Sequence, residues 1–280
     1  MTNIYTNVDH LAVTLGDDRV LRLTLDKPDK RNALDDDMVD ALIERIDAAG
    51  RDEAGGAVLL DAVGAHFCSG FDIVGRNKAK PDGGQGSGDG AKPRIGSIQR
   101  RLPSQAHRLI PLMCSVQVPI VCAVRGWVAG IGLHLAAASD FTIVAADAKV
   151  WEPFSQRGFT PDSGATWLLP RLVGVQRARR LLLRGESISG TEAVEWGLFS
   201  EAVSVGEVAT IAERTAVELA NGPTVTLGLT KHLLTTSSTA TLGEQLQAEA
   251  FAMELSSRSE DFKEGLAAFV EKRDPNFTGR

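Results

Sequence analysis

The sequence has few cysteines, no basic block and no long apolar run, and each of these absences argues against a class of protein. Its three cysteines, Cys68, Cys114 and Cys122, lack metal-type spacing and lie in apolar stretches, so we interpret them as small core residues and predict no metal site. Its net charge of −6 and the lack of a basic block argue against a nucleic-acid partner. Because it shows neither a signal peptide nor an apolar run of membrane length, we expect a cytoplasmic protein that does not enter a membrane.

What is present is sufficient for a large core. A chain of 280 residues with 43% hydrophobic content can form one large domain with an appendage. Residues 11–15 and 20–25 alternate apolar and polar side chains around a Gly-Asp-Asp turn, which predicts a β-hairpin. Residues 35–49 have helical spacing. Apolar runs predict buried strands at 57–60, 119–124 and 141–144. This alternation predicts the α/β class.

Two segments differ from this pattern. Residues 76–94 are rich in Gly, Lys, Pro, Ser and Asp and cannot contribute to a core, so they predict a mobile loop, which either orders on ligand binding or has no role. From residue 205 onward the pattern predicts helices only. We therefore divide the chain into an α/β core at 1–204 and a helical C-terminal region at 205–280.

The most informative segment is residues 126–140, with the sequence GWVAGIGLHLAAASD, which directly follows a predicted strand. Its glycines let backbone approach a ligand closely, and its alanine-rich part predicts a helix. A strand, a glycine turn and a helix start together aim backbone N–H groups at one point, where negative charge is stabilised. This arrangement supplies the backbone N–H donors that an oxyanion hole needs.

A second turn points to the same chemistry. The strand at 57–60 leads into residues 66–73, HFCSGFDI, where Gly70 permits a tight turn that exposes the N–H of Phe71. We expect the N–H groups of Phe71 and Ile131 to hold one carbonyl oxygen between them.

These two turns resemble the crotonase superfamily, the enoyl-CoA hydratase/isomerase family. Its members carry a Phe-Cys-x-Gly-x-Asp-Ile/Leu turn and, further on, a Gly-x-x-x-Gly-x-Gly helix start. More segments resemble the family, in the family's order and over nearly the whole chain: residues 28–34, 158–166, 187–198 and 265–275.

The resemblance implies a crotonase-like ββα spiral core, a C-terminal helical trimerisation region, and a homotrimer or a hexamer made of two trimers. It implies an acyl-CoA thioester as substrate, with coenzyme A as part of that substrate and no permanently bound cofactor. It also implies a set of CoA contacts: Lys30, Arg31, Ala33, Phe71, Asp72, Ile73, Phe269 and Lys272. Lys272 and Phe269 would reach the nucleotide end from a neighbouring subunit. For the basic residues the alternative is a solvated surface charge.

The sequence departs from the family's hydratases, which hold a water molecule between two glutamates. His134 stands at the first glutamate position and Phe154 at the second, so we do not expect ordinary hydration of a 2-enoyl-CoA. Glu152 lies two residues before the second position. His134 is either a neutral core histidine bonded to backbone or an acid–base group that faces the acyl chain.

Asp162 is the best remaining acid–base candidate. It follows a proline where some isomerase branches, and the 4-chlorobenzoyl-CoA dehalogenase branch, carry a catalytic aspartate. Apolar neighbours, namely Phe154, Phe159 and Trp167, would raise its pKa. The alternative is an N-cap for a helix that begins near Ser163.

Three further residues are assigned to the acyl pocket. His107 matches the histidine base of the dehalogenase branch, with a surface helix histidine as the alternative. Trp127 and Gly130, together with Phe154, are expected to form pocket wall or neighbouring core.

We therefore predict an enzyme that stabilises a thioester enolate. The leading reaction is a double-bond shift in an enoyl-CoA, with Asp162 moving the proton. The alternatives are a hydratase that uses His134 or Glu152 as its base, a hydrolase that opens a cyclic β-diketone CoA ester, and a non-catalytic CoA-binding subunit. The sequence does not identify the acyl group.

Overall fold

The computed structural model describes residues 4–73, 96, 99–100 and 102–280. Within them the strands form a larger sheet with the order β1-β2-β3-β4-β6-β9 and a smaller sheet with the order β5-β7-β8. The strands are β1 Leu11–Leu15, β2 Val20–Leu25, β3 Ala57–Ala62, β4 Ile120–Val124, β5 Trp127–Ala129, β6 Phe141–Ala145, β7 Lys149–Trp151, β8 Ser187–Ser189 and β9 Glu201–Val203.

Helices connect these strands and form the C-terminal part of the chain. The α-helices are α1 Asp36–Ala49, α4 Ala106–Ser115, α5 Ile131–Ala138, α6 Ala165–Arg184, α7 Gly190–Glu195, α8 Val208–Ala220, α9 Thr224–Ser237, α10 Leu242–Ser256 and α11 Glu260–Glu271. Single 3-10 turns are η1 Pro28–Lys30, η2 Leu102–Ser104 and η3 Ser155–Arg157. None of the described helices is long and apolar enough to cross a membrane.

The predicted hairpin, helix and buried strands are all present. β1 and β2 pair antiparallel, and β2, β3, β4, β6 and β9 continue the larger sheet in parallel. Helix α1 begins after Asp35, whose side chain accepts a hydrogen bond from the Met38 N–H. The α/β class is confirmed. The predicted loop at 76–94 lies outside the described residues.

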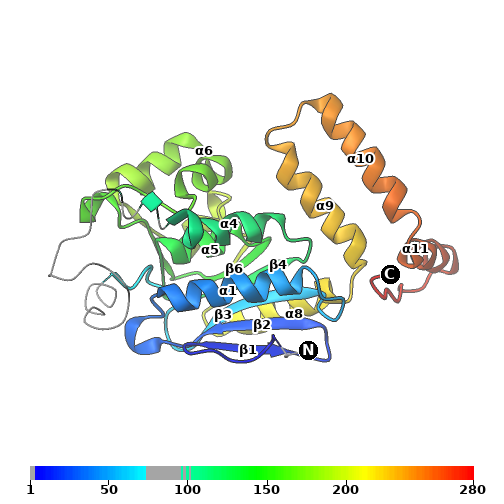
Figure 1. The fold of residues 1–280 in the computed structure, drawn as a ribbon, viewed down its shortest axis with the longest axis horizontal. Coiled ribbons are helices and arrows are strands. Elements are labelled where there is room, and N and C mark those ends of the chain that lie inside the picture. Colours follow the sequence, from blue (N-terminus) through cyan, green and yellow to red (C-terminus); the bar gives the residue numbers. More distant parts are fainter. Residues whose placement is uncertain (1–3, 74–95, 97–98, 101) are drawn as a thin grey trace.

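Helices cover both faces of the larger sheet (Figure 1). α1, α4 and α5 pack along one another, and α8 packs against β3, β4 and β6. The buried face of α8 is made of small residues, which allows the close approach: a Cβ on Gly56 would lie 2.5 Å from the Ala220 carbonyl oxygen. The first helix of the predicted region 205–280 therefore packs with the sheet, and the projecting part begins at α9.

The cysteines are core residues, as predicted. Cys68 and Cys122 are fully buried, Cys114 is partly buried, and all three are free thiols. Burial raises the pKa of Cys68 to about 12 and raises the pKa of the other two thiols as well. Thiols that stay protonated at neutral pH are poor nucleophiles, so they belong to the packing of the core.

Helices α9 and α10 form a pair that projects from the rest of the molecule (Figure 1). α9 is attached through Lys231, whose Nζ lies 2.7 Å from Asp140 Oδ2 and donates to the Val118 carbonyl at 3.2 Å. Several large apolar side chains of α9, α10 and α11 are exposed in the single chain: Leu234, Leu242, Leu246, Phe251, Met253, Leu255, Phe262, Leu266, Phe269 and Val270.

Helix α5 packs very closely against the segment after β3 at Gly132. A side chain at this position would not fit. A Cβ on Gly132 would lie 2.6 Å from Cys68 Cβ and 2.9 Å from its carbonyl oxygen. The carbonyl is backbone held in a bridge between Cys68 and Val128, so it cannot swing aside as a flexible side chain would. The absent side chain at Gly132 thus sets the distance between α5 and the Cys68 turn.

We expect the substitution Gly132→Ala to destabilise the protein. Overpacking at this contact should lower the free energy of unfolding by about 1–3 kcal/mol, measured by urea unfolding. Gly243→Ala in α10 is the control, because a Cβ there meets nothing within 4 Å and alanine favours a helix. Equal unfolding midpoints for Gly132→Ala and the wild type would contradict this account of the contact.

Candidate active site

The two predicted turns lie side by side at the ends of β3 and β4. The Cys68 N–H donates to the Trp127 carbonyl at 3.1 Å, and the Ala129 N–H donates to the Cys68 carbonyl at 2.9 Å. Past this bridge the turns remain close: a Cβ on Gly130 would lie 3.8 Å from the Cα of Gly70. Both glycines have positive φ, 106° at Gly70 and 52° at Gly130, which other residues rarely adopt.

The backbone at each turn favours the predicted N–H donors. Ile131 is the first residue of α5, and an N–H in the first turn of a helix has no partner within that helix. At the other turn, the Leu34 N–H donates to the Gly70 carbonyl and the Asp72 N–H donates to the Leu34 carbonyl, so this bridge uses the neighbours of Phe71. The positive end of the α5 dipole adds to the stabilisation of an anion here.

A buried histidine–glutamate pair lies beside the start of α5. His134 Nε2 is 2.9 Å from Glu152 Oε1, and both side chains are 0% exposed. Two neighbouring hydrogen bonds bring the residues together: the His134 N–H donates to the Gly130 carbonyl, and the Gly130 N–H donates to the carbonyl of Trp151, which precedes Glu152. Each of the two was predicted separately as a possible base, but sequence reasoning missed that they form a pair.

Burial controls the protonation of this pair. It raises the pKa of the Glu152 carboxyl, the nearby His134 lowers it, and the charge of Asp162 raises it further, with a net upward direction. A proton on either Glu152 or His134, shared across the hydrogen bond, leaves the pair without net charge. Since an ionised carboxylate beside a neutral imidazole would bury a full negative charge, the neutral pair is favoured.

Phe154 closes the space in front of this pair. Its ring stacks on the His134 ring at a centroid distance of 6.0 Å and is only 4% exposed. The Phe154 ring also lies close to the Gly130 turn, since Phe154 Cζ is 4.0 Å from the Cβ position of Gly130. Phe159 packs edge-on against Phe154 at 5.4 Å and is 42% exposed. The predicted pocket residues Gly130 and Phe154 are therefore in contact.

Asp162 does not cap a helix. α6 begins at Ala165, its N-cap is Gly164, and no side chain caps it. The structure thus contradicts the capping alternative, because Ser163 and Gly164 both adopt positive φ and carry the chain past Asp162 before the helix starts. Asp162 is half-buried, and its charge acts on the Glu152 carboxyl.

The basic residues predicted to contact CoA lie next to the Gly70 turn. The Ser69 N–H donates to the Arg31 carbonyl at 3.0 Å. Lys30 Nζ lies 2.6 Å from Asp72 Oδ2, and Lys27, which the sequence did not single out, joins this group at 3.4 Å. Burial, and then the positive charge of Arg31, lowers the pKa of His66, so the charge of Arg31 acts on this part of the surface.

A buried asparagine holds that basic turn in shape. Asn32 is fully buried, its amide donates to the carbonyls of Val63 and His66, and its Oδ1 accepts from the Lys27 N–H. Arg31 and Asn32 both have positive φ. These bonds present Arg31 to solvent, place Ala33 in the core, and leave Ile73, after the Gly70 turn, partly exposed.

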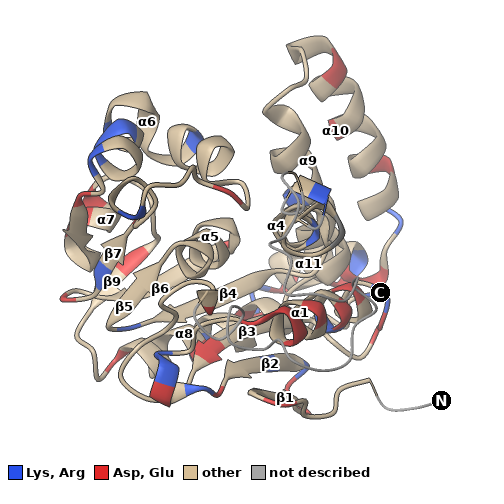
Figure 2. Cartoon of the chain, turned by 60° about the vertical axis from the view of Figure 1, so that its left-hand side comes forward, with Lys and Arg blue, Asp and Glu red and all other residues tan. Residues whose placement is uncertain are grey.

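Other predicted residues lie elsewhere. His107 is an exposed residue on α4. Trp127 packs edge-on against Trp151 of the neighbouring strand at 5.8 Å, with Lys149 Nζ 5.2 Å from its ring centroid. Phe269 and Lys272 belong to α11 and its C-cap, on the side of the molecule away from α6 (Figure 1). Figure 2 shows basic residues on α6, above α5, and acidic residues along α1.

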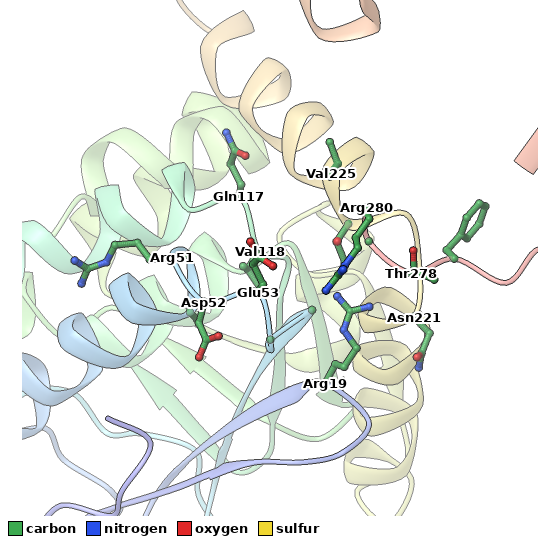
Figure 3. A pocket seen from close by; sticks show the side chains of 17 residues that line it. Arg19, Arg51, Asp52, Glu53, Gln117, Val118, Asn221, Val225, Thr278 and Arg280 are labelled. Atoms are coloured by element: carbon green, nitrogen blue, oxygen red, sulfur yellow. The ribbon is translucent and has the colours of Figure 1, made fainter. Parts of the chain in front are cut away.

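The described part of the chain also contains a cavity of about 820 Å³ that none of the predicted site residues lines. It lies between the end of α1, the start of α9 and the C-terminal tail, with Arg19 and Arg280 pointing into it (Figure 3). This is the end of the sheet where β3 and β4 begin, whereas the two glycine turns follow the opposite ends of those strands. We therefore identify the candidate active site from the chemistry of the residues around the two glycine turns and not from the size of this cavity.

Comparisons with known proteins identify the family of the chain. A family model described as enoyl-CoA hydratase/isomerase matches residues 16–280. The chain is 38% identical to 1,2-epoxyphenylacetyl-CoA isomerase of Escherichia coli, over 93% of this chain and 95% of that protein. It is 36% identical to a Rhodobacter capsulatus protein named "Probable enoyl-CoA hydratase", over 92% and 94%.

The fold comparison gives the same family. A crystal structure of an enoyl-CoA hydratase from Polaromonas superposes with a TM-score of 0.84 at 29% identity, covering 95% of this chain and 99% of that one. The resemblance carried by the two glycine turns is confirmed, and so is the crotonase-like fold. The chain belongs to the enoyl-CoA hydratase/isomerase family, and it is an enzyme of that type.

Proposed function

We propose that this enzyme isomerises an acyl-CoA by moving a proton within an enoyl thioester. The observation that carries the proposal is the position of Asp162. Its side chain is half-buried, does not cap α6, and acts electrostatically on the Glu152 carboxyl, which lies next to the start of α5. A carboxylate free of a capping role beside an oxyanion turn is suited to proton transfer.

The reaction follows from the two donors and this carboxylate. The N–H groups of Phe71 and Ile131 both donate a hydrogen bond to the thioester oxygen, which lies between them. Asp162 removes a proton from the carbon next to the double bond, and the electron pair moves through the conjugated system onto that oxygen as an enolate. The two N–H groups stabilise the charge, each by about 3 kcal/mol in comparable sites. The Asp162 carboxyl then returns its proton to the other end of the system, so the double bond has moved and no electrons are lost.

Hydration is the less suitable reaction for this site. A hydratase of the family needs a water molecule held by two carboxylates. Here Glu152 is hydrogen-bonded to His134, and the ring of Phe154 stacks on that histidine. The relatives include proteins named as an isomerase and as a hydratase, so their names do not choose between the two reactions.

We expect the enzyme to hydrate crotonyl-CoA slowly, because His134 and Phe154 occupy the two positions where the family's hydratases carry the glutamates that hold water. Turnover should stay below about 10 per second, the median of enzymes on their own substrates. The assay follows loss of absorbance of the conjugated thioester, and a 3-enoyl-CoA supplied to the same sample tests the isomerase direction. Hydration at or above that rate would mean that His134 or Glu152 positions the water.

We expect Asp162→Asn to lower isomerase turnover by about 100-fold or more, because asparagine keeps the size of the side chain and removes the proton acceptor. Asp147→Asn, which changes an exposed aspartate in the turn between β6 and β7, is the matched control and should retain wild-type turnover. Thermal unfolding checks that both variants fold. An Asp162→Asn enzyme with undiminished turnover would remove the proposed base.

We propose that the chain assembles as a trimer, or as a hexamer of two trimers. The apolar side chains exposed on α9, α10 and α11 form more apolar surface than an isolated chain usually leaves in water. Helix α11, which contains Phe269 and ends at Lys272, lies on the opposite side of the molecule from α6 (Figure 1), as expected if these residues serve a neighbour's CoA. In a closed ring each such contact occurs three times.

We expect light scattering to give the mass of three or six chains. Lys272→Gln should weaken CoA binding about tenfold, because one charge-assisted hydrogen bond to a phosphate is lost. Lys263→Gln, an exposed lysine on the same helix, is the control and should bind CoA like the wild type. A folded monomer whose CoA affinity is the same with and without Lys272 would contradict the proposed assembly.

A further inference from the structure

The His134–Glu152 pair has hydrogen-bonding capacity that the protein does not use. His134 Nδ1 and Glu152 Oε2 are buried and have no hydrogen-bond partner among the described residues. A buried polar atom without a partner costs free energy, and apolar residues of the same volume generally replace a buried ionisable pair without loss of stability. Stability of the fold therefore does not explain why both residues are present.

The unused atoms lie beside the predicted oxyanion turn. His134 lies in the first turn of α5, the turn that begins at Ile131, and its N–H donates to the Gly130 carbonyl at 3.0 Å. Glu152 directly follows β7, whose last carbonyl accepts from the Gly130 N–H. A thioester bound by the Ile131 N–H would thus place its acyl chain next to this pair.

Aromatic side chains pack against the pair and lead from it toward the surface. Phe154 stacks on His134, and the partly exposed Phe159 packs edge-on against Phe154. A rotation of Phe154 about its side-chain bonds opens the pair to an acyl group. This rotation breaks no hydrogen bond of a helix or strand, because a phenyl ring makes none. The ring also keeps bulk water from the pair, so a ligand atom replaces a protein contact instead of competing with solvent.

The chemistry of the pair selects its ligand. In its neutral form, either Glu152 carries the proton and donates it to His134 Nε2, or His134 carries both protons. Both arrangements leave an N–H on Nδ1 as a hydrogen-bond donor. An N–H donor in an apolar surrounding binds an uncharged oxygen acceptor, and a plain hydrocarbon chain offers none.

We infer that the natural acyl group carries an oxygen atom, as a ketone or an epoxide, which accepts a hydrogen bond from His134 Nδ1. This inference rests on the proposed function and narrows its substrate class from enoyl-CoA esters in general to oxygenated ones. Glu152 is the positioning residue, because it fixes the ring of His134 through Nε2.

The test compares two CoA esters that differ by one oxygen atom. Acetoacetyl-CoA and butyryl-CoA have the same chain length, and isothermal titration calorimetry gives their dissociation constants. The wild type should bind acetoacetyl-CoA about tenfold or more tightly than butyryl-CoA. In the double variant His134→Leu/Glu152→Leu, which leaves neither partner buried alone, this ratio should fall to about one. Thermal unfolding checks the fold of each variant.

A matched control and a second variant complete the test. Lys231→Met removes the ion pair with Asp140, on the side of the core where α9 is attached, and should keep the tenfold ratio. His134→Gln keeps an amide that can bond to Glu152 but lacks the ring N–H, so it should lose the ratio even if the double variant does not fold.

The outcomes separate this inference from the proposed function. Equal affinity of the wild type for both esters, or a preference for acetoacetyl-CoA that survives in both His134 variants, overturns the inference alone. Failure of the wild type to bind either ester overturns the proposed function.

Discussion

The close approach of two stretches of backbone is the constraint on which the site depends. The turn at Gly70 and the turn at Gly130 lie beside each other with the positive φ that glycine adopts readily, and Gly132 lets α5 pack directly on Cys68. The parallel pairing of β3 with β4 brings both turns to the same edge of the sheet. A methyl group added at Gly132 would meet Cys68 at 2.6 Å and push α5 away from the Gly70 turn, whereas at Gly70 and Gly130 the obstacle to a side chain is the positive φ. Both changes would alter the positions of the proposed N–H donors, whose value depends on a fixed distance from one oxygen.

Because the donors belong to the main chain, the side chains around them can vary without loss of the oxyanion site. The reaction is then set by the few groups that reach the acyl carbons. In the reaction that we propose for this chain, these groups are an imidazole, a phenyl ring and an aspartate: His134, Phe154 and Asp162. The same scaffold can therefore serve isomerases and hydratases, and the names of the relatives reflect this.

Much of the fold could be predicted from the sequence, because the relevant signals are local. The alternation in β1 and β2, the acidic first turn of α1 and the glycine spacing before α5 each depend on a few neighbouring residues. The pairing of His134 with Glu152 could not be predicted in this way. It depends on the register of β5 with β7, which sets Ala129 opposite Trp151 and so brings the residue after β7 to the first turn of α5. The ion pairs of Lys27 with Asp35 and Asp72 likewise join segments that are distant in the sequence.

An N-cap role was the alternative that the local sequence offered for Asp162, and the structure contradicts it for a physical reason. Asp-Ser before a helical pattern is a frequent N-cap signal, but here Gly164 takes the cap position and the chain turns twice through positive φ before α6 begins. The turns leave the carboxylate half-buried at the site instead of engaged with backbone N–H groups.

The charges of the site remain in balance throughout the proposed reaction. A neutral His134–Glu152 pair does not oppose a negative charge on the thioester oxygen, whereas an ionised Glu152 at the same place would. When Asp162 takes up a proton, its own charge disappears as the enolate forms, so the site carries one negative charge before and after the transfer. That charge only moves, from a carboxylate near the surface to an oxygen held by two N–H groups and the positive end of α5. Burial raises the pKa of the Glu152 carboxyl, and in the proposed reaction this raised pKa keeps the pair neutral at the place where the enolate forms.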